Sequence, residues 1–157
     1  MIKINVVCVG KVKEKYFSSA IEEYSKRLSR FCKLTVIEVK EENFVAEPDE
    51  SEREIIKKKE GEAIVEKIKG KSVLTDVLGK KISSEDMAKI IAQSVNAGQE
   101  LTFVIGGSYG VSQRVKDFCD EKISFSDMTF PHTLARVILF EQIYRAFKIN
   151  ENGRYHK

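Results

Sequence analysis

Short apolar segments alternate with longer amphipathic segments along this chain, and this alternation constrains its fold more than any other feature. Runs with strand character occupy residues 2–9, 33–39, 72–77, 101–105 and 122–126. Apolar residues recur at helical spacing between and after them, at 13–31, 55–68, 83–98, 111–121 and 131–147. Strands separated by helices favour a parallel sheet, and continuously apolar strands indicate burial on both faces. The pattern therefore predicts an α/β fold, a mostly parallel sheet with helices on both faces.

The length of the chain fits one self-contained domain. A chain of 157 residues is about one domain long and buries roughly two thirds of its unfolded surface, so we expect a single domain over residues 1–157. No stretch approaches the roughly 20 apolar residues of a membrane span, and the N-terminal segment lacks a signal-type cleavage site. We therefore expect a cytoplasmic protein without a membrane partner.

The cysteines do not form a pattern that binds metal or builds a disulfide framework. Cys8, Cys32 and Cys119 are odd in number and far apart, whereas such frameworks use even numbers of cysteines and zinc sites use close pairs. We expect three buried thiols and no metal site.

The formal charge of the chain is concentrated at its C-terminal end. Residues 131–157 hold five Lys/Arg against two Asp/Glu, which accounts for the whole net charge of +3. Both histidines, His132 and His156, lie in the same segment. A basic segment fits a phosphate-rich partner, and it also fits an ordinary solvated helix face.

Three predicted strands end in segments rich in glycine or in small polar residues. The sequence FVIGGSYGV (103–111) ends a strand in two glycines, while TDVLGK (75–80) and SFSDMTF (124–130) follow two other strands. The glycines match neither the dinucleotide fingerprint nor the phosphate loop. Because the carboxyl ends of parallel strands share one edge of a sheet, and glycine lets backbone approach a ligand closely, these segments predict a pocket at that edge.

The last predicted helix is apolar around more of its circumference than a surface helix needs. Leu134, Val137, Ile138 and Tyr144 extend the apolar face beyond the positions that one sheet can cover. A second copy of the chain is the simplest partner, so we expect a homodimer. The polar tail that follows, residues 148–157, fits either a frayed terminus or a functional segment.

The chain resembles a known family, most specifically in its C-terminal part. The segments FVIGGSYG, SFSDMTFPHTLARVILFEQIYRAFKI and the terminal YHK are similar to the RlmH (YbeA-type) family of SPOUT methyltransferases. The resemblance extends essentially from end to end. It implies a homodimeric enzyme that uses S-adenosylmethionine to methylate N3 of a pseudouridine in 23S ribosomal RNA, with the assembled ribosome as its expected partner. It also implies a C-terminal trefoil knot, which no pattern argument would produce.

The resemblance assigns a cofactor role to the three strand ends. It implies that Thr75 and Gly106, each at the end of a predicted strand, contact the cofactor. It implies further contacts from the whole loop after the last strand, namely Phe125, Ser126, Asp127, Met128, Thr129 and Phe130. Some relatives carry Leu at the position of Thr75, so a backbone contact there would be the more general one.

Methyl transfer to an imide nitrogen requires positioning and removal of a proton. His156 is the favoured base because its ordinary pKa is near neutrality, with Glu141 as the second candidate and His132 as a third. The RNA-binding residues that we expect are basic or aromatic and lie in the C-terminal segment: Arg136, Arg145, Arg154, Tyr155 and Lys157. Arg154 stands where the family usually has Pro.

Two other classes of protein would share some of these features. A flavodoxin-like nucleotide-binding module would explain the alternation and the glycines. A non-enzymatic dimeric RNA-binding protein would explain the basic C-terminus.

Overall fold

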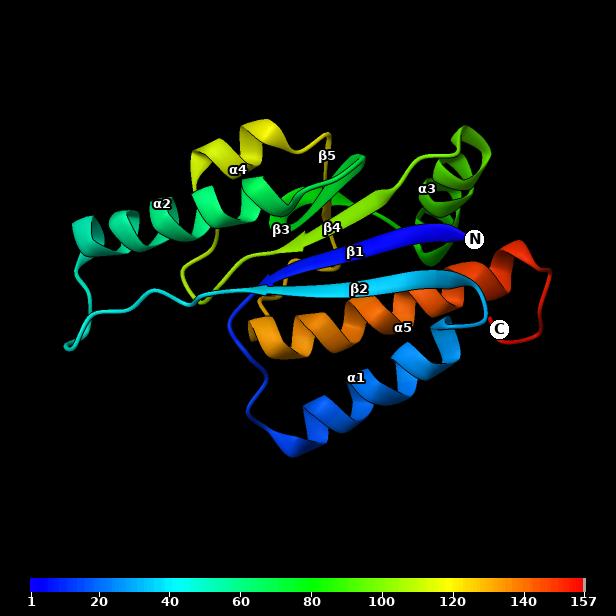
Figure 1. Cartoon of the computed structure of the whole chain (residues 1–157), viewed down its shortest axis with the longest axis horizontal. Coiled ribbons are helices and arrows are strands. Elements are labelled where there is room, and N and C mark those ends of the chain that lie inside the picture. Colours follow the sequence, from blue (N-terminus) through cyan, green and yellow to red (C-terminus); the bar gives the residue numbers. More distant parts are fainter. Residues whose placement is uncertain (157) are drawn as a thin grey trace.

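The computed structural model describes residues 1–156 and confirms the alternation of strands and helices (Figure 1). In chain order its elements are β1 (Ile2–Val9), α1 (Lys15–Leu28), β2 (Cys32–Val39), α2 (Glu50–Lys67), β3 (Lys71–Lys81), α3 (Ser84–Ala97), β4 (Leu101–Ile105), α4 (Gln113–Phe118), β5 (Glu121–Ser124) and α5 (His132–Asn150). Helix α4 is shorter than predicted because Ser112 caps its first turn and the backbone is extended at Cys119.

The five strands form one parallel sheet in the order β2-β1-β4-β3-β5. This confirms the predicted α/β class with a parallel sheet. The order differs from the flavodoxin-like order 2-1-3-4-5, so the flavodoxin-like alternative is wrong.

Helices cover both faces of the sheet, as predicted. Helices α1, α3 and α5 pack on one face against residues such as Phe103, and α2 and α4 pack on the other against residues such as Val104 (Figure 1). Neighbouring residues of a strand point to opposite faces, so both Phe103 and Val104 are completely buried. This double burial explains why β4 is apolar throughout.

Helix α3 begins and ends where its sequence predicts. The Ser83 hydroxyl accepts a hydrogen bond from the Asp86 N–H, and the Asp86 carboxylate accepts one from the Ser83 N–H. Gly98 ends the helix in the left-handed conformation, with φ of 64°. A similar capping box, Asp49 with Glu52, starts α2. These caps satisfy backbone donors and acceptors that helix ends leave free.

Strand β3 extends beyond its predicted end because its chain pairs with β5 a second time, at Lys80 and Lys81. Thr75 and Lys80 both align with Ile123, and the residues between them bulge away from the ladder. A Cβ at Gly79 would lie 2.7 Å from the carbonyl carbon of Ile123, so only glycine permits this approach. The trefoil knot implied by the resemblance stays a prediction.

The state of the cysteines and the length of the helices bear on two further expectations. Cys8, Cys32 and Cys119 are buried free thiols, as predicted. Within residues 1–156, no helix is long and apolar enough to cross a membrane.

The contact between Gly79 and Ile123 predicts a large effect of one methyl group. We expect Gly79→Ala to lower the free energy of unfolding by about 1 to 3 kcal/mol, because the added carbon forces two backbones apart. Urea denaturation would measure this loss. Lys80→Ala, a substitution of an exposed neighbour, is the control and should change stability by less than about 0.5 kcal/mol. If Gly79→Ala were as stable as the wild-type chain, the close contact between Gly79 and Ile123 would be contradicted.

Candidate active site

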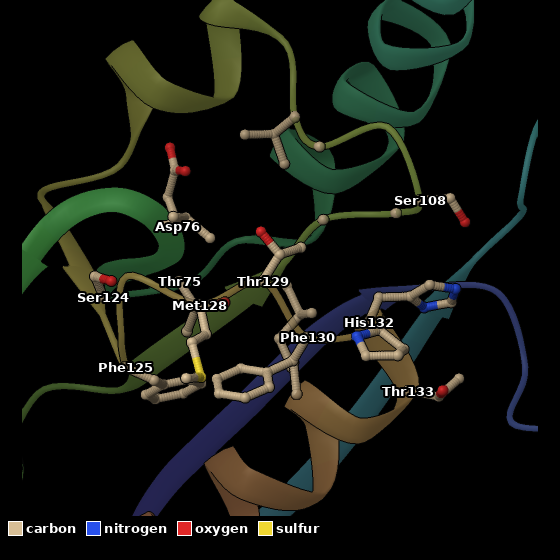
Figure 2. A pocket seen from close by; sticks show the side chains of 18 of the residues that line it. Thr75, Asp76, Ser108, Ser124, Phe125, Met128, Thr129, Phe130, His132 and Thr133 are labelled. Atoms are coloured by element: carbon tan, nitrogen blue, oxygen red, sulfur yellow. The ribbon is translucent and has the colours of Figure 1, made fainter.

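A cavity of about 700 Å³ opens at the carboxyl edge of the sheet, where β4 and β5 end, the middle of β3 bulges from its ladder and α5 begins (Figure 2). Seven of the eight residues expected to contact a cofactor line it: Thr75, Gly106, Phe125, Ser126, Met128, Thr129 and Phe130. Asp127 does not line the cavity, because its carboxylate pairs with Lys81 on β3. The structure thus brings together three loops that are up to about 50 residues apart in the chain.

The lining combines apolar and polar side chains. Figure 2 shows Phe125, Met128 and Phe130 on one side of the cavity and Asp76 on another. No sequence pattern singles out Asp76, although it directly follows Thr75 near the end of a predicted strand. The Thr75 hydroxyl donates its hydrogen to the Val104 carbonyl oxygen at 3.0 Å, so the side chain could offer a ligand only its oxygen, as an acceptor.

The two glycines after β4 serve the packing of their own loop. A Cβ at Gly106 would lie 2.7 Å from Cγ1 of Val111, and a Cβ at Gly107 would lie 2.9 Å from Oε1 of Glu60. From the sequence, close approach of a ligand is the expected reason for these glycines. The structure corrects that reason, because the space that each Cβ would fill is already occupied by protein.

Glu60 is a buried carboxyl group behind this glycine loop. Its residue is 4% exposed, and its carboxylate accepts a hydrogen bond from the Glu42 N–H at 3.0 Å. Burial, with smaller contributions from the charges of Glu41 and Glu42, raises the pKa of Glu60 to about 7. Glu60 is not among the residues expected from the sequence, since a glutamate in a charged helix looks solvent-exposed.

Of the three candidate bases named from the sequence, His132 is the one that lines the cavity among the residues that the structure describes. Burial lowers its pKa, and the nearby Arg136 acts in the same direction against Glu41 and Glu14. The ring is therefore neutral at neutral pH and can accept a proton.

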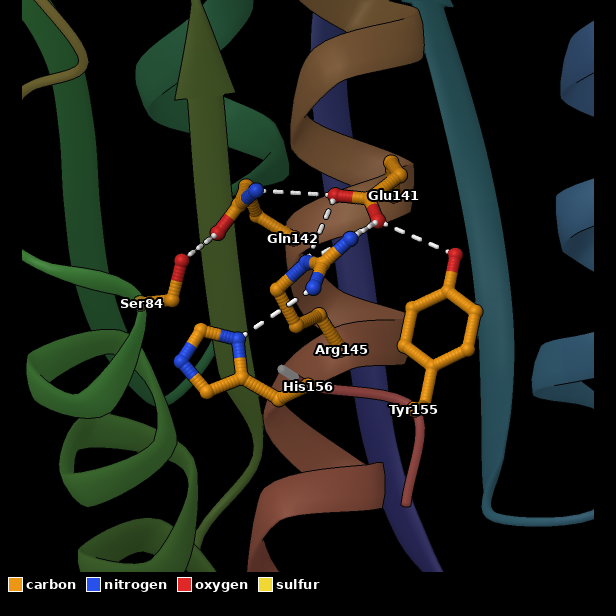
Figure 3. Close-up of polar contacts among 6 residues, drawn as sticks. All are labelled: Ser84, Glu141, Gln142, Arg145, Tyr155 and His156. Atoms are coloured by element: carbon orange, nitrogen blue, oxygen red, sulfur yellow. Dashed lines mark hydrogen bonds and ion pairs between the residues drawn. The ribbon is translucent and has the colours of Figure 1, made fainter. Parts of the chain in front are cut away.

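Glu141 and His156 lie in a second polar cluster near the end of the chain (Figure 3). Arg145 Nη2 donates to Glu141 Oε1 at 2.7 Å, and the Tyr155 hydroxyl donates to the same oxygen at 3.1 Å. Tyr155 and His156 lie on opposite sides of the Arg145 side chain. Burial and the bond to Glu141 raise the pKa of Tyr155 to about 12, which keeps its hydroxyl protonated. Of the two alternatives for the tail, these contacts favour an ordered segment at residues 155 and 156.

The neighbours of His156 define its tautomer. Arg145 Nη1 lies 3.2 Å from Nδ1, and Glu85 Oε1 lies 2.7 Å from Nε2. An arginine can only donate, so Nδ1 accepts and Nε2 carries the hydrogen that is donated to Glu85. Both ring nitrogens are thus engaged.

The two sites are separated within one chain. Arg145, which contacts His156, lies thirteen positions after His132 on α5, which corresponds to about 20 Å along a helix. The structure therefore does not place His156 or Glu141 at the cavity of their own chain.

The predicted RNA-binding residues occupy different environments. The Arg136 side chain is 3% exposed, with Nη1 2.8 Å from Glu38 and Nη2 donating to the Gly10 carbonyl oxygen at 3.1 Å. A buried and paired guanidinium cannot meet an RNA phosphate, so this prediction is wrong. Arg154 is exposed and Tyr155 is half-buried. Lys157 lies outside the described residues.

Comparison with known proteins identifies the family. The model of a family described as predicted SPOUT methyltransferase matches residues 2–156. The chain belongs to the SPOUT methyltransferase family. It is 47% identical to the ribosomal RNA large subunit methyltransferase H of Clostridium novyi and 50% identical to ribosomal RNA large subunit methyltransferase H 1 of Clostridium perfringens. Each match covers 99% of this chain and 100% of the relative.

A solved structure supports the fold. The tRNA (m1G37) methyltransferase of Aquifex aeolicus superposes with a TM-score of 0.53 at 16% identity, over 91% of this chain and 69% of that one. This confirms the predicted fold class. In this SPOUT chain, no three His, Cys, Asp or Glu side chains within residues 1–156 gather closely enough to hold a metal ion.

The buried carboxyl group of Glu60 predicts a pH-dependent stability. Its folded pKa of about 7 lies above the ordinary value of 4.5, so the folded chain binds more protons between these values and loses stability as the pH rises through them. Glu60→Gln keeps an oxygen for the Glu42 N–H but cannot ionise. We expect the variant to gain about 1 to 3 kcal/mol relative to wild type between about pH 5 and pH 8. Urea denaturation at both pH values would measure the gain, and a constant difference would contradict it.

Proposed function

We propose that this SPOUT chain uses S-adenosylmethionine to methylate N3 of a pseudouridine in 23S ribosomal RNA, as a homodimer that acts on the assembled ribosome in the cytoplasm. The observation that carries the proposal is the cavity at the carboxyl edge of the sheet, lined by the three predicted loops. The names of the full-length relatives, which are ribosomal RNA large subunit methyltransferases, support the substrate. A non-enzymatic RNA-binding protein would not need such a cavity.

The cavity fits S-adenosylmethionine in size and chemistry. Its volume of about 700 Å³ is typical of small-molecule sites, which range from about 300 to 1,000 Å³. Phe125 and Phe130 offer apolar surface for a purine ring, and Asp76 offers a negative charge for a cation. When bound, S-adenosylmethionine supplies an electrophilic methyl group.

The chain contributes mainly by positioning the acceptor nitrogen and excluding water. The loops of the cavity start from buried strands, so their backbones are held by the sheet. Met128 is 71% exposed beside the cavity, where it can cover a bound base. Fixing two reactants in near-attack geometry replaces an encounter in solution, which is a large part of the rate that an enzyme supplies.

A second copy of the chain would join the two separated sites. Val77, Leu78 and Met128, at or beside the cavity, are large apolar residues with exposures of 40%, 86% and 71%. On α5, Leu134, Val137 and Ile138 are only half-buried and lie between the cavity and the tail. A two-fold axis through this stretch would bring the tail of one copy to the cavity of the other.

His156 and Glu141 of the second copy are the proposed catalytic residues, and His132 is the alternative base within the cavity. The target imide must lose its proton from N3. Nδ1 of His156 already accepts from Arg145, so it must leave this partner before it can take a proton there. Arg145, Arg154, Tyr155 and Lys157 are the proposed RNA contacts of the same region. We also propose that the bulged segment of β3, between Thr75 and Lys80, is part of a trefoil knot.

The direct test is methylation of ribosomes. The purified chain, given S-adenosylmethionine labelled in its methyl group and ribosomes isolated from cells that lack the enzyme, should transfer one methyl group to 23S ribosomal RNA. Mass spectrometry of the digested RNA should locate it on N3 of a pseudouridine. Ribosomal RNA that stays unlabelled, or label on another position, would refute this substrate.

Exchange of subunits tests the shared site. Gly106→Val should displace the glycine loop through its contact with Val111 and abolish cofactor binding, while deletion of residues 154–157 should leave cofactor affinity intact. Each homodimer should be inactive. The two chains, co-expressed with separate affinity tags, should recover about a quarter of wild-type activity. Random pairing makes about half of the dimers mixed, and each mixed dimer holds one intact cavity facing one intact tail out of two sites. No recovery in purified heterodimers would show that the tail does not act on the partner's cavity.

A further inference from the structure

Aromatic rings gather where the C-terminal ends of α1 and α5 lie side by side (Figure 1). The centroid of the Tyr144 ring lies 5.0 Å from that of Tyr155, 6.1 Å from that of Phe31 and 6.5 Å from that of Tyr24. All four residues are half-buried, so each ring packs on the protein and keeps some surface in water. Tyr24, Phe31 and Tyr144 pack against the main core, and the surface that each ring keeps in water is free to meet a ligand.

Basic side chains lie over these rings. Cζ of Arg27 is 5.4 Å from the centroid of Tyr24 and 5.7 Å from that of Tyr144, and Nζ of Lys148 is 5.8 Å from that of Phe31. A cleft of about 110 Å³ opens among Arg27, Arg30, Phe31, Tyr144 and Lys148, with Glu151 at its edge. Cations are thus interleaved with aromatic faces on one continuous surface.

The acidic neighbours leave these cations available. Glu23 pairs with Arg27 at 3.0 Å and Glu151 pairs with Lys148 at 3.0 Å, and all four side chains are at least 27% exposed. Exposed pairs of this kind contribute about 0 to 1 kcal/mol, so either cation can exchange its carboxylate for a phosphate at low cost. Arg30 is exposed and has no ion-pair partner among residues 1–156.

We propose that this aromatic-basic surface binds the single-stranded RNA that flanks the target nucleotide. The surface consists of Tyr24, Arg27, Arg30, Phe31, Tyr144 and Lys148. Unpaired bases stack on aromatic rings and on guanidinium planes, while Lys and Arg hold the phosphates, and this combination is the usual way in which proteins bind single-stranded RNA. An acidic protein partner would use the cations but would gain little from the exposed rings.

The position of the surface agrees with this role. Tyr155 joins it to the tail through its ring contact with Tyr144, and Arg145 lies over the Tyr155 ring with Cζ 4.7 Å from the centroid. RNA bound here would therefore pass beside the residues that are proposed to close over the target base. The inference rests on the proposed function, because it names the path by which that substrate reaches the tail.

Binding of RNA without cofactor tests the surface separately from catalysis. The probes are a labelled single-stranded RNA of about 12 nucleotides, within the usual site size, and transcribed 23S ribosomal RNA. Arg30→Ala should weaken binding about threefold to tenfold and reduce the dependence of log Kd on log salt by about 0.7. Tyr24→Leu should weaken binding about tenfold with an unchanged salt dependence, because stacking releases no counterions. Lys58→Ala, an exposed change on α2 at the other face of the sheet, is the matched control and should bind like wild type.

Steady-state methylation completes the test. Arg30→Ala and Tyr24→Leu should raise KM for the ribosomal substrate while kcat and the Kd for S-adenosylmethionine stay at wild-type values. In Arg27→Lys, RNA bases should lose their stacking on the guanidinium, while the salt dependence of RNA binding should stay unchanged because the charge is kept. Wild-type RNA affinity in Arg30→Ala and in folded Tyr24→Leu would overturn the inference, as would a salt dependence that falls equally in the control. An inactive wild-type chain that still shows these binding differences would refute the proposed function and leave the RNA surface standing.

Discussion

The pairing of β3 with β4 and β5 is the constraint on which the candidate site depends. It aligns Thr75 with Ile105 on one side and with Ile123 on the other, so the residues that follow β4 and β5 lie beside Thr75 at one edge of the sheet. After Thr75 the chain bulges out of the ladder and pairs with β5 again at Lys80, where Gly79 lies against the backbone of Ile123 because it has no side chain. The loop that follows β5 leads directly into α5. Parallel pairing across three neighbouring strands thus brings the three segments to one cavity.

The features that could be predicted from sequence have local or topological causes. Apolar periodicity identified the strands, and Ser83 with Gly98 marked both ends of α3, since caps depend on neighbouring backbone. The edge that holds the cavity followed from the parallel sheet alone. Arg136 could not be placed, because residue type does not tell which side of a helix faces the core. The reason for Gly106 was also missed, since a distant side chain, Val111, fills the space beside it.

The two histidines lie in different electrostatic environments. His132 lines the cavity and is kept neutral by burial, whereas His156 is held between a cation and a carboxylate at the far end of α5. Within one chain, thirteen helical positions or about 20 Å separate His132 from Arg145, the partner of His156. The exposed apolar residues around the cavity and along α5 give a physical reason for a second copy, whose tail would complete the site. The aromatic-basic surface next to that tail would then guide the RNA.

The central claim is that the cavity at the carboxyl edge of the sheet binds the methyl donor. Isothermal titration of the purified chain with S-adenosylmethionine measures this without any RNA. Binding should be seen in the wild-type chain and should be lost when Asp76→Ala removes the negative charge from the cavity, while the melting temperature stays within a few degrees of wild type. The account would be contradicted if the folded wild-type chain gave no heat of binding. It would also be contradicted if folded Asp76→Ala and the folded double variant Asp76→Ala/Gly106→Val both bound S-adenosylmethionine with wild-type affinity.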